Sequence, residues 1–373
     1  MYNAIARFNL LGCVVVGLIL FYQSARASEQ AILPVYKDKT NLLQYLDASG
    51  NMHPVRTPLE WQKRRSHILE NMQRVMGPLP MQWAHLPLNN EVTEESKHPK
   101  FVRKKIAFNA EPGDRVSAWL FIPQPEKSKM PAVLCLHQTT ASGKDEPAGL
   151  SGNPELHYAR ELAERGFITL APDYWTFGDY RGKPYNPLTN GFASGTMKGI
   201  WNHRRALDVL ASLPQVDGAR FGCIGHSLGG HNALWLAAFD ERITVVVSSC
   251  GFNSFACYAA SPYAGGTLKN WAQDRYMPRI ASEYNSDPTK VPFDWHEVLV
   301  AIAPRKVFIN APINDANFVV VGVKECVNAA VPVFTLFQAQ NNLVMQNPEA
   351  GHSFPEQVRH AAYEFIAEAL LKN

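Results

Sequence analysis

The chain has 373 residues, of which 46% are hydrophobic, 18% charged and 11% aromatic. A disordered chain would be poorer in apolar residues, and the 24 Gly and 26 Pro show no collagen-like period of three. A formal net charge of +3 without long charge runs argues against nucleic acid as a partner. Only one long apolar stretch occurs, which excludes a protein with several membrane spans.

The first 27 residues have the pattern of an export signal. Arg7 lies in a start without acidic residues, residues 10–21 are apolar, and Ser24-Ala25-Arg26-Ala27-Ser28 offers a cleavage site after Ala27. The apolar run is short for a span of about 20 residues, although an uncleaved anchor is the alternative. We expect a secreted or periplasmic protein without stable membrane association after the signal, residues 1–27, is removed.

The cysteines after the signal do not suggest a disulfide framework, because their number is odd. They are Cys135, Cys223, Cys250, Cys257 and Cys326. Cys135 and Cys223 lie in apolar, strand-like runs and are expected to be buried. Cys250 and Cys257 could pair, and the sequence leaves this open. Neither a CxxC pair nor an HExxH motif occurs, so we expect no metal and no other cofactor.

Residues 28–100 are expected to form an N-terminal extension packed on the main domain. Thr57-Pro58-Leu59-Glu60 is a capping box with Pro at the first helical position, and apolar residues follow at helical spacing as far as Gly77. This predicts one helix beginning at Pro58, which is too little structure for a separate domain.

Residues 101–373 alternate between strand and helix patterns. The predicted strands are 101–108, 116–122, 131–136, 167–171, 220–224, 243–248, 306–310 and 331–337; the predicted helices include 194–213, 229–239, 319–329 and 357–371. The run at 131–136 is apolar throughout, as in a strand covered on both faces. The pattern predicts an α/β fold with a mostly parallel central sheet and helices on both faces.

Residues 251–295 interrupt this rhythm and are rich in aromatic residues. The rings are Phe252, Phe255, Tyr258, Tyr263, Trp271, Tyr276, Tyr284, Phe293 and Trp295. We interpret the segment as a cap inserted over one end of the sheet. The alternative is that the rings only hold the insertion in place.

Gly225-His226-Ser227-Leu228-Gly229 matches the nucleophile motif G-x-S-x-G. It falls between a predicted strand and a predicted helix, where a sharp turn would expose the serine at the strand's carboxyl end. The two outer glycines avoid side-chain clashes in such a turn. Ser227 is therefore the predicted nucleophile.

A serine nucleophile needs a base and an orienting acid, which follow it in the order acid, then histidine, in this type of fold. Asp315 comes just after the predicted strand 306–310, and its alternative role is a helix cap. His352 lies in a Gly-flanked loop before the last helix. We predict that Ser227 attacks an ester carbonyl, His352 transfers the proton, and Asp315 orients the imidazole.

The remaining site predictions are less direct. The backbone N–H groups of Leu228 and Gln138 are expected to form the oxyanion hole, although the glycines typical of the second segment are missing. Trp175, Thr139 and His226 are expected to contact the substrate. Trp175 could instead belong to a structural turn with Asp173.

At this point the chain resembles the α/β-hydrolase family, and more narrowly its secreted dienelactone-hydrolase-like and acetyl xylan esterase-like members. The resemblance covers residues 100–370. It depends on Leu136-His137-Gln138, Pro172-Asp173, the Ser227 motif, Ala303-Pro304-Arg305, Asp315-Ala316-Asn317-Phe318 and Gly351-His352. Dienelactone hydrolases use a cysteine nucleophile, so Ser227 favours ordinary esters. Glucuronoyl esterases carry Cys and Arg around the serine, where this chain has His226 and Leu228.

The resemblance implies hydrolysis of carboxylic esters, such as acetyl groups on plant polysaccharide. The expected partner is therefore a small-molecule or carbohydrate ester, with the oligomeric state left open. Two alternatives remain: a peptidase of the prolyl-oligopeptidase type, for whose propeller the extension is too short, and a non-catalytic binding protein on a hydrolase fold.

Overall fold

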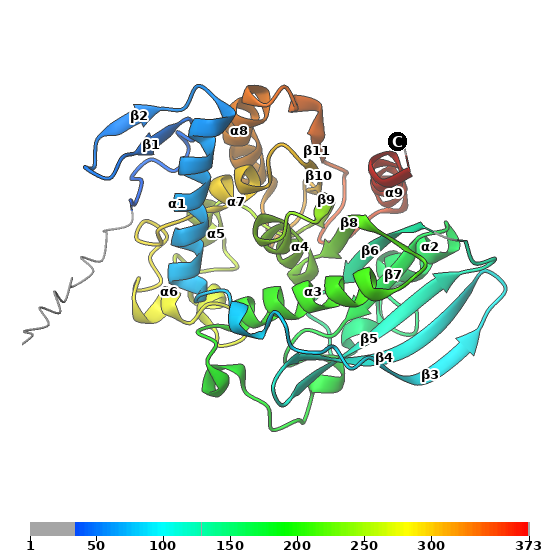
Figure 1. Cartoon of the computed structure of the whole chain (residues 1–373). Coiled ribbons are helices and arrows are strands. Elements are labelled where there is room, and N and C mark those ends of the chain that lie inside the picture. The colour runs from blue at the N-terminus through cyan, green and yellow to red at the C-terminus, as the bar shows by residue number, and fades with distance from the viewer. Residues whose placement is uncertain (1–33, 128, 372–373) are drawn as a thin grey trace, which may run out of the picture. The chain divides into compact units, whose positions relative to one another are not determined.

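A nine-stranded mixed sheet forms the centre of the computed structural model, which describes residues 34–127 and 129–371 (Figure 1). The strand order is β11-β10-β9-β8-β6-β7-β5-β4-β3. The strands are β3 (Glu91–Lys97), β4 (Phe101–Glu111), β5 (Asp114–Pro123), β6 (Met130–Leu136), β7 (Ile168–Pro172), β8 (Val216–His226), β9 (Ile243–Ser249), β10 (Lys306–Asn310) and β11 (Leu343–Gln346). Strands β6 to β11 pair in parallel, whereas β3, β4 and β5 pair antiparallel.

Helices cover both faces of this sheet, which confirms the predicted α/β fold. The helices are α1 (Pro58–Met76), α2 (Tyr158–Glu164), α3 (Gly195–Ser212), α4 (Leu228–Phe239), α5 (Phe255–Ala260), α6 (Arg279–Ser282), α7 (Trp295–Ile302), α8 (Val320–Leu336) and α9 (Glu356–Leu371). Strand β6 shows why both faces are needed. Leu134 packs into a core with α3 and α4, while its neighbour Cys135 packs into a second core with α2 and α9.

The predicted helix at Pro58 is present as α1. Thr57 and Glu60 form the capping box, and the chain leaves the helix at Gly77, whose φ is 94°. Trp61 on the inner face is fully buried in the same core as α3, α4 and α7. Helix α1 therefore contributes directly to the core, and Leu33–Asn373 forms one compact unit. The predicted signal, residues 1–27, lies outside the described residues.

The prediction of a strand at 331–337 is wrong. These residues continue α8, which runs to Leu336 with Pro332 inside it. Val323, Val327 and Phe334 are buried at helical spacing, so packing overrides the β-branched and aromatic composition. The strand that pairs with β10 is instead β11, four half-buried residues at the edge of the sheet.

Two further observations concern the pairing of the cysteines and the presence of membrane spans. All five cysteines in the described part of the chain are free, so Cys250 and Cys257 do not pair. Among the described residues, no helix combines the length and apolar character needed to cross a membrane.

Candidate active site

Ser227 occupies a strained turn between β8 and α4. Its φ of 53° is unusual for a residue with a side chain. The turn is tight enough that a Cβ on Gly225 would lie 2.2 Å from the backbone of Gly229, and one on Gly229 would lie 1.9 Å from the carbonyl oxygen of Leu136. The backbone N–H of Ser227 donates to the carbonyl of Ser249 at 2.8 Å, which ties the turn to the end of β9. The glycines of the motif are thus sterically required.

Asp315 and His352 meet beside this turn, from two loops that are 37 residues apart in the sequence. Nδ1 of His352 lies 2.9 Å from Oδ2 and 3.1 Å from Oδ1 of Asp315. The backbone N–H groups of Asn317 and Phe318 also donate to Oδ1, at 2.8 and 3.2 Å. Asp315 is only 3% exposed, so these bonds replace water around its carboxylate.

The electrostatics of this pair favour an ionised Asp315. Burial alone would raise its pKa, but the hydrogen bond and charge of His352 and the two N–H donors outweigh burial and lower the pKa. A carboxylate accepts the Nδ1 proton, which leaves Nε2 of His352 as the basic atom. Nε2 has no hydrogen-bond partner among the described residues.

A buried polar network that includes His226, Ser249 and Asn310 packs against the imidazole of His352. The ring of His226 packs against it, and Nδ1 of His226 lies 2.9 Å from Oγ of Ser249. Nδ2 of Asn310 donates to the same Oγ at 2.8 Å and to the carbonyl of Ser353 at 2.9 Å. The network connects the ends of β8, β9 and β10 to the loop that carries His352.

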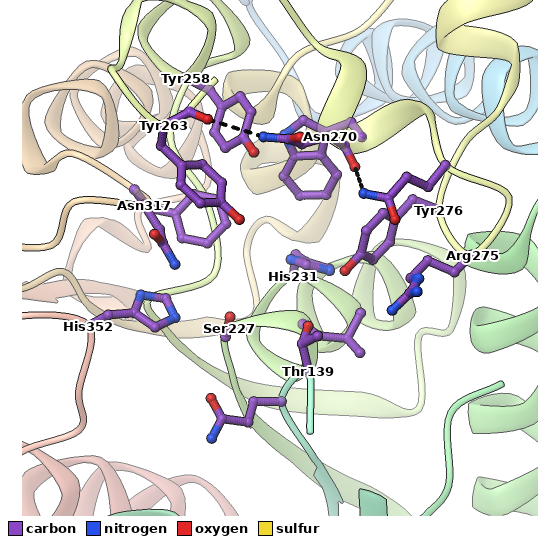
Figure 2. Close-up of a pocket in the computed structure, with 15 residues that line it drawn as sticks. Thr139, Ser227, His231, Tyr258, Tyr263, Asn270, Arg275, Tyr276, Asn317 and His352 are labelled. Carbon is purple, nitrogen blue, oxygen red and sulfur yellow. Dashed lines mark hydrogen bonds between the residues drawn. The ribbon is translucent and has the colours of Figure 1, made fainter. Parts of the chain in front are cut away.

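Ser227 and His352 face a pocket of about 340 Å³ at the carboxyl ends of the parallel strands (Figure 2). The lining comes from the sheet side and from the 251–295 segment. It comprises Gln138, Thr139, Ser227, Leu228, His231, Tyr258, Tyr263, Asn270, Trp271, Gln273, Arg275, Tyr276, Asn317, Phe318 and His352. This is a partly open, largely polar site with several hydrogen-bonding side chains.

The structure brings Gln138, Thr139 and Leu228 to the pocket together with Ser227 and His352. Leu228 is the first residue of α4, where backbone N–H groups have no partner within the helix. Gln138 follows β6, the strand next to β8 in the sheet. Both residues therefore line the same pocket as Ser227.

Two predicted substrate contacts do not line the pocket. His226 is 1% exposed and lies under His352, in the network described above. Trp175 packs with Tyr174 and Phe177, and its Nε1 donates to the carbonyl of Tyr185 at 3.2 Å. Asp173, two residues before Trp175, is buried against Lys144, with 2.8 Å between Oδ2 and Nζ, so the turn is structural.

The aromatic rings of residues 251–295 divide into two groups. Tyr258, Tyr263, Trp271 and Tyr276 line the pocket. The fully buried rings instead hold the segment to the body of the protein; they are Phe252, Phe255, Phe293 and Trp295. One set of rings therefore lines the pocket, and the other holds the segment in place.

Sequence reasoning missed several polar lining residues. His231 lies one helical turn after Ser227, so its position on the same face of α4 could have been inferred from the motif. Asn317 and Phe318 lie two and three residues after Asp315, in a segment that carries the family resemblance. Arg275 lies in a segment without a recognisable motif, and no local signal identifies it.

The site contains one group of potential metal ligands. Atoms of His226, Cys250 and His352 lie within 4.8 Å of one another. In the structure, however, Nδ1 of His352 is bonded to Asp315, and Sγ of Cys250 lies 3.4 Å from the carbonyl oxygen of Ser353. Burial also raises the pKa of the Cys250 thiol well above its ordinary value, which disfavours the thiolate that metals bind. Hydrogen bonding accounts for these contacts.

Comparisons with known proteins agree with this fold. A family model described as "Glucuronyl esterase, fungi" matches residues 181–338, and one described as "Acetyl xylan esterase (AXE1)" matches residues 81–257. The protein YtaP of Bacillus subtilis, named as a hydrolase, is 25% identical over 321 residues, which cover 82% of this chain and 100% of that protein.

Other similar proteins are named as esterases of carbohydrates. A 4-O-methyl-glucuronoyl methylesterase of Hypocrea jecorina is 25% identical over 170 residues, or 43% of this chain and 36% of that protein. The solved structure of a glucuronoyl esterase from Solibacter usitatus covers 92% of this chain and 100% of its own, with a TM-score of 0.68 and 20% identity. At that identity the structural likeness is one of fold.

Proposed function

We propose that Ser227, His352 and Asp315 form the catalytic triad of this chain. The chain is a carboxylic-ester hydrolase of the α/β-hydrolase fold and is similar to acetyl xylan esterases. The bond between Nδ1 of His352 and the buried carboxylate of Asp315 carries this proposal. It fixes the imidazole with Nε2 free, in the pocket that also contains the strained Ser227. A helix-capping aspartate alone would not need this histidine.

The proposed reaction proceeds through an acyl-enzyme. Oγ of Ser227 attacks the ester carbonyl while Nε2 of His352 takes its proton, and the same proton then passes to the departing alcohol. Water repeats the steps on the acyl-serine and releases the acid. Asp315 stays ionised throughout and stabilises the imidazolium.

The oxyanion of each tetrahedral intermediate needs preorganised donors. The backbone N–H groups of Leu228 and Gln138 are the proposed pair, because both residues line the pocket beside Ser227. Loss of one such donor costs about 3 kcal/mol of transition-state stabilisation in serine hydrolases.

Short acyl esters of carbohydrates, such as sugar acetates, are the proposed substrates. The similarity to carbohydrate esterases supports a carbohydrate ester as the substrate. The lining adds hydroxyl and amide groups to aromatic rings, a combination that suits a sugar, whose faces are apolar and whose edges form hydrogen bonds. Residues 251–295 act as a cap that supplies much of this wall.

We further propose that residues 1–27 direct export and that the mature protein is secreted or periplasmic. The amino terminus of the purified mature protein tests this directly. Sequencing should begin at Ser28, and a mature chain that still carries residues 1–27 would contradict the proposal.

The first test is hydrolysis of p-nitrophenyl acetate by the wild type and by Ser227→Ala. The wild type should turn over at least about 10³-fold faster, because the variant lacks the nucleophile. Equal rates would contradict the esterase mechanism and favour a binding protein. Peptidyl p-nitroanilides added to the same assay distinguish a peptidase, which would cleave them faster than the ester.

A further inference from the structure

The charge of the pocket lining is one-sided. The lining includes Arg275 and, among the described residues, neither Asp nor Glu. Asp315 is nearby but buried behind His352, where it is occupied by that imidazole and two backbone N–H groups. A substrate in this pocket therefore meets a positive charge and no exposed negative one.

Arg275 is held in place through its backbone and its guanidinium. The neighbouring carbonyls of Asp274 and Tyr276 accept hydrogen bonds from the backbone N–H groups of Gly195 and Thr196 at 2.9 and 3.0 Å. The hydroxyl of Tyr174 donates to the carbonyl of Arg275 itself. The guanidinium carbon lies 5.4 Å from the centre of the Phe177 ring. This preorganisation reduces the entropy lost on binding a ligand.

Apart from this contact with the Phe177 ring, the guanidinium is left without a polar partner among the described residues. In the part of the chain that the structure describes, Arg275 forms no ion pair and no side-chain hydrogen bond. Arg305, by contrast, has hydrogen-bond acceptors for its guanidinium group: its side chain donates to the carbonyls of Ala237, Asp240 and Ile243. Arg275 thus keeps its planar set of donors available, which matches a carboxylate.

A second side chain in the pocket, that of His231, has one ring nitrogen without a partner among the described residues. His231 is 4% exposed, its Nδ1 lies 3.2 Å from the carbonyl oxygen of Gly251, and its Nε2 has no partner among the described residues. If Nδ1 donates to that carbonyl, Nε2 is an acceptor for a hydroxyl. Figure 2 shows His231 between Ser227 and Tyr276, with Arg275 on the opposite side of Ser227 from His352.

From these contacts we infer that the substrate is an ester that carries a free carboxylate, which Arg275 binds while His231 accepts a hydrogen bond from a hydroxyl group. The inference rests on the proposed esterase function and narrows it to acidic esters, such as acetylated uronic acids or half-esters of dicarboxylic acids. In the first class the carboxylate belongs to the alcohol part, and in the second to the acyl part.

Two matched pairs of substrates test the inference and separate the two sources of the carboxylate. The acyl pair is mono-p-nitrophenyl succinate and its neutral methyl ester. The alcohol pair is O-acetylated methyl glucuronoside and O-acetylated methyl glucoside, with acetate release as the signal. The measured quantity is the ratio of kcat/KM for the anionic to the neutral member, in the wild type, Arg275→Gln and Arg279→Gln.

Arg279 is a suitable control because it lies four residues away in the same segment and is paired with Glu283 at 3.3 Å. We expect a wild-type ratio of about ten or more in at least one pair, as a hydrogen-bonded ion pair would give. The ratio should fall toward one in Arg275→Gln, remain in Arg279→Gln, and decrease with added salt.

Two failures can be told apart. Hydrolysis of the neutral esters with ratios near one in both pairs would overturn the inference and leave the esterase function intact. A ratio that survives in Arg275→Gln would also overturn it. No hydrolysis of any of the four esters beyond that of Ser227→Ala would contradict the esterase function itself.

Discussion

The imidazole ring of His226 packs against that of His352, with 4.8 Å between the ring centroids and 60° between the planes. His226 is buried, and burial together with the neighbouring His352 lowers its pKa to about 3. It is therefore neutral near pH 7 and supports the second ring without repelling the imidazolium that forms during catalysis. This relationship assigns His226, the second residue of the Gly-His-Ser-Leu-Gly motif, a positioning role.

Replacement of His226 by Ala should lower kcat by about 100-fold, because small displacements of a catalytic group have effects of that size. KM should change little, since the side chain lies outside the pocket lining. Steady-state kinetics on p-nitrophenyl acetate measures both constants, and His226→Gln, which can keep a hydrogen bond to Ser249, should recover part of the loss. An unchanged kcat in His226→Ala would contradict the positioning role.

Asn310 offers a test of stability at the same network. Its side-chain amide joins Ser249 to the carbonyl of Ser353, and Asn310→Ala leaves the buried Ser249 hydroxyl and the partly buried Ser353 carbonyl without this donor. The free energy of unfolding should fall by about 1–3 kcal/mol. Urea denaturation measures the change, with the exposed Asn41→Ala as the control. Equal stability of the two variants would show that the network does not hold the His352 loop.

Asp315→Asn should retain the fold but lower kcat by about 10⁴-fold, because an amide can stabilise the wrong tautomer of His352. Circular dichroism establishes the fold, and p-nitrophenyl acetate hydrolysis gives kcat. Activity near that of the wild type would mean that the acid is misplaced.

The lowered pKa of Asp315 also has a consequence for stability. A carboxylate whose pKa is lower in the folded state stabilises the fold above its unfolded pKa of about 3.9, and this contribution disappears as the pH falls through the lower, folded value. The stability difference between the wild type and Asp315→Asn should therefore shrink on acidification. A pH series of urea denaturation measures it, and a difference that grows toward acid would contradict the pKa direction.

The buried ion pair between Arg64 in α1 and Glu297 in α7 allows a test of how much the contact between these two helices contributes to the stability of the fold. The atoms are 2.8 Å apart and both side chains are fully buried. Arg64→Met leaves Glu297 without its partner and should destabilise by about 3–5 kcal/mol. Adding Glu297→Gln, which keeps the bond to the backbone of Asp294, should restore much of the loss. Equal stability of the single and double variants would contradict the coupling.

The sequence was sufficient for the parts of the fold with strong local signals. The capping box at Thr57 and the apolar run of β6 lead to the observed elements because propensity and packing agree there. Strand β3 was not predicted because its exposed residues, such as Glu94 and Glu95, carry no apolar alternation; it is held as an edge strand by β4 and by pairs with Lys105 and Lys104.

The same distinction applies to the site. Ser227, Asp315 and His352 could be proposed from the sequence because this type of fold places each member of a triad at a recognisable point in the chain order. Arg275 could not, since its place in the pocket depends on hydrogen bonds that its neighbours Asp274 and Tyr276 accept from Gly195 and Thr196, far away in the sequence. Trp175 was expected in the pocket because the sequence does not show that Asp173 is buried against Lys144, a contact between segments far apart in the chain.

The most direct test of the central claim is covalent labelling of the nucleophile. A fluorophosphonate should inactivate the protein, and peptide mass spectrometry should find one phosphonylated residue, Ser227, in proportion to the activity lost. Label on another residue, or full inactivation without modification of Ser227, would contradict the proposed mechanism.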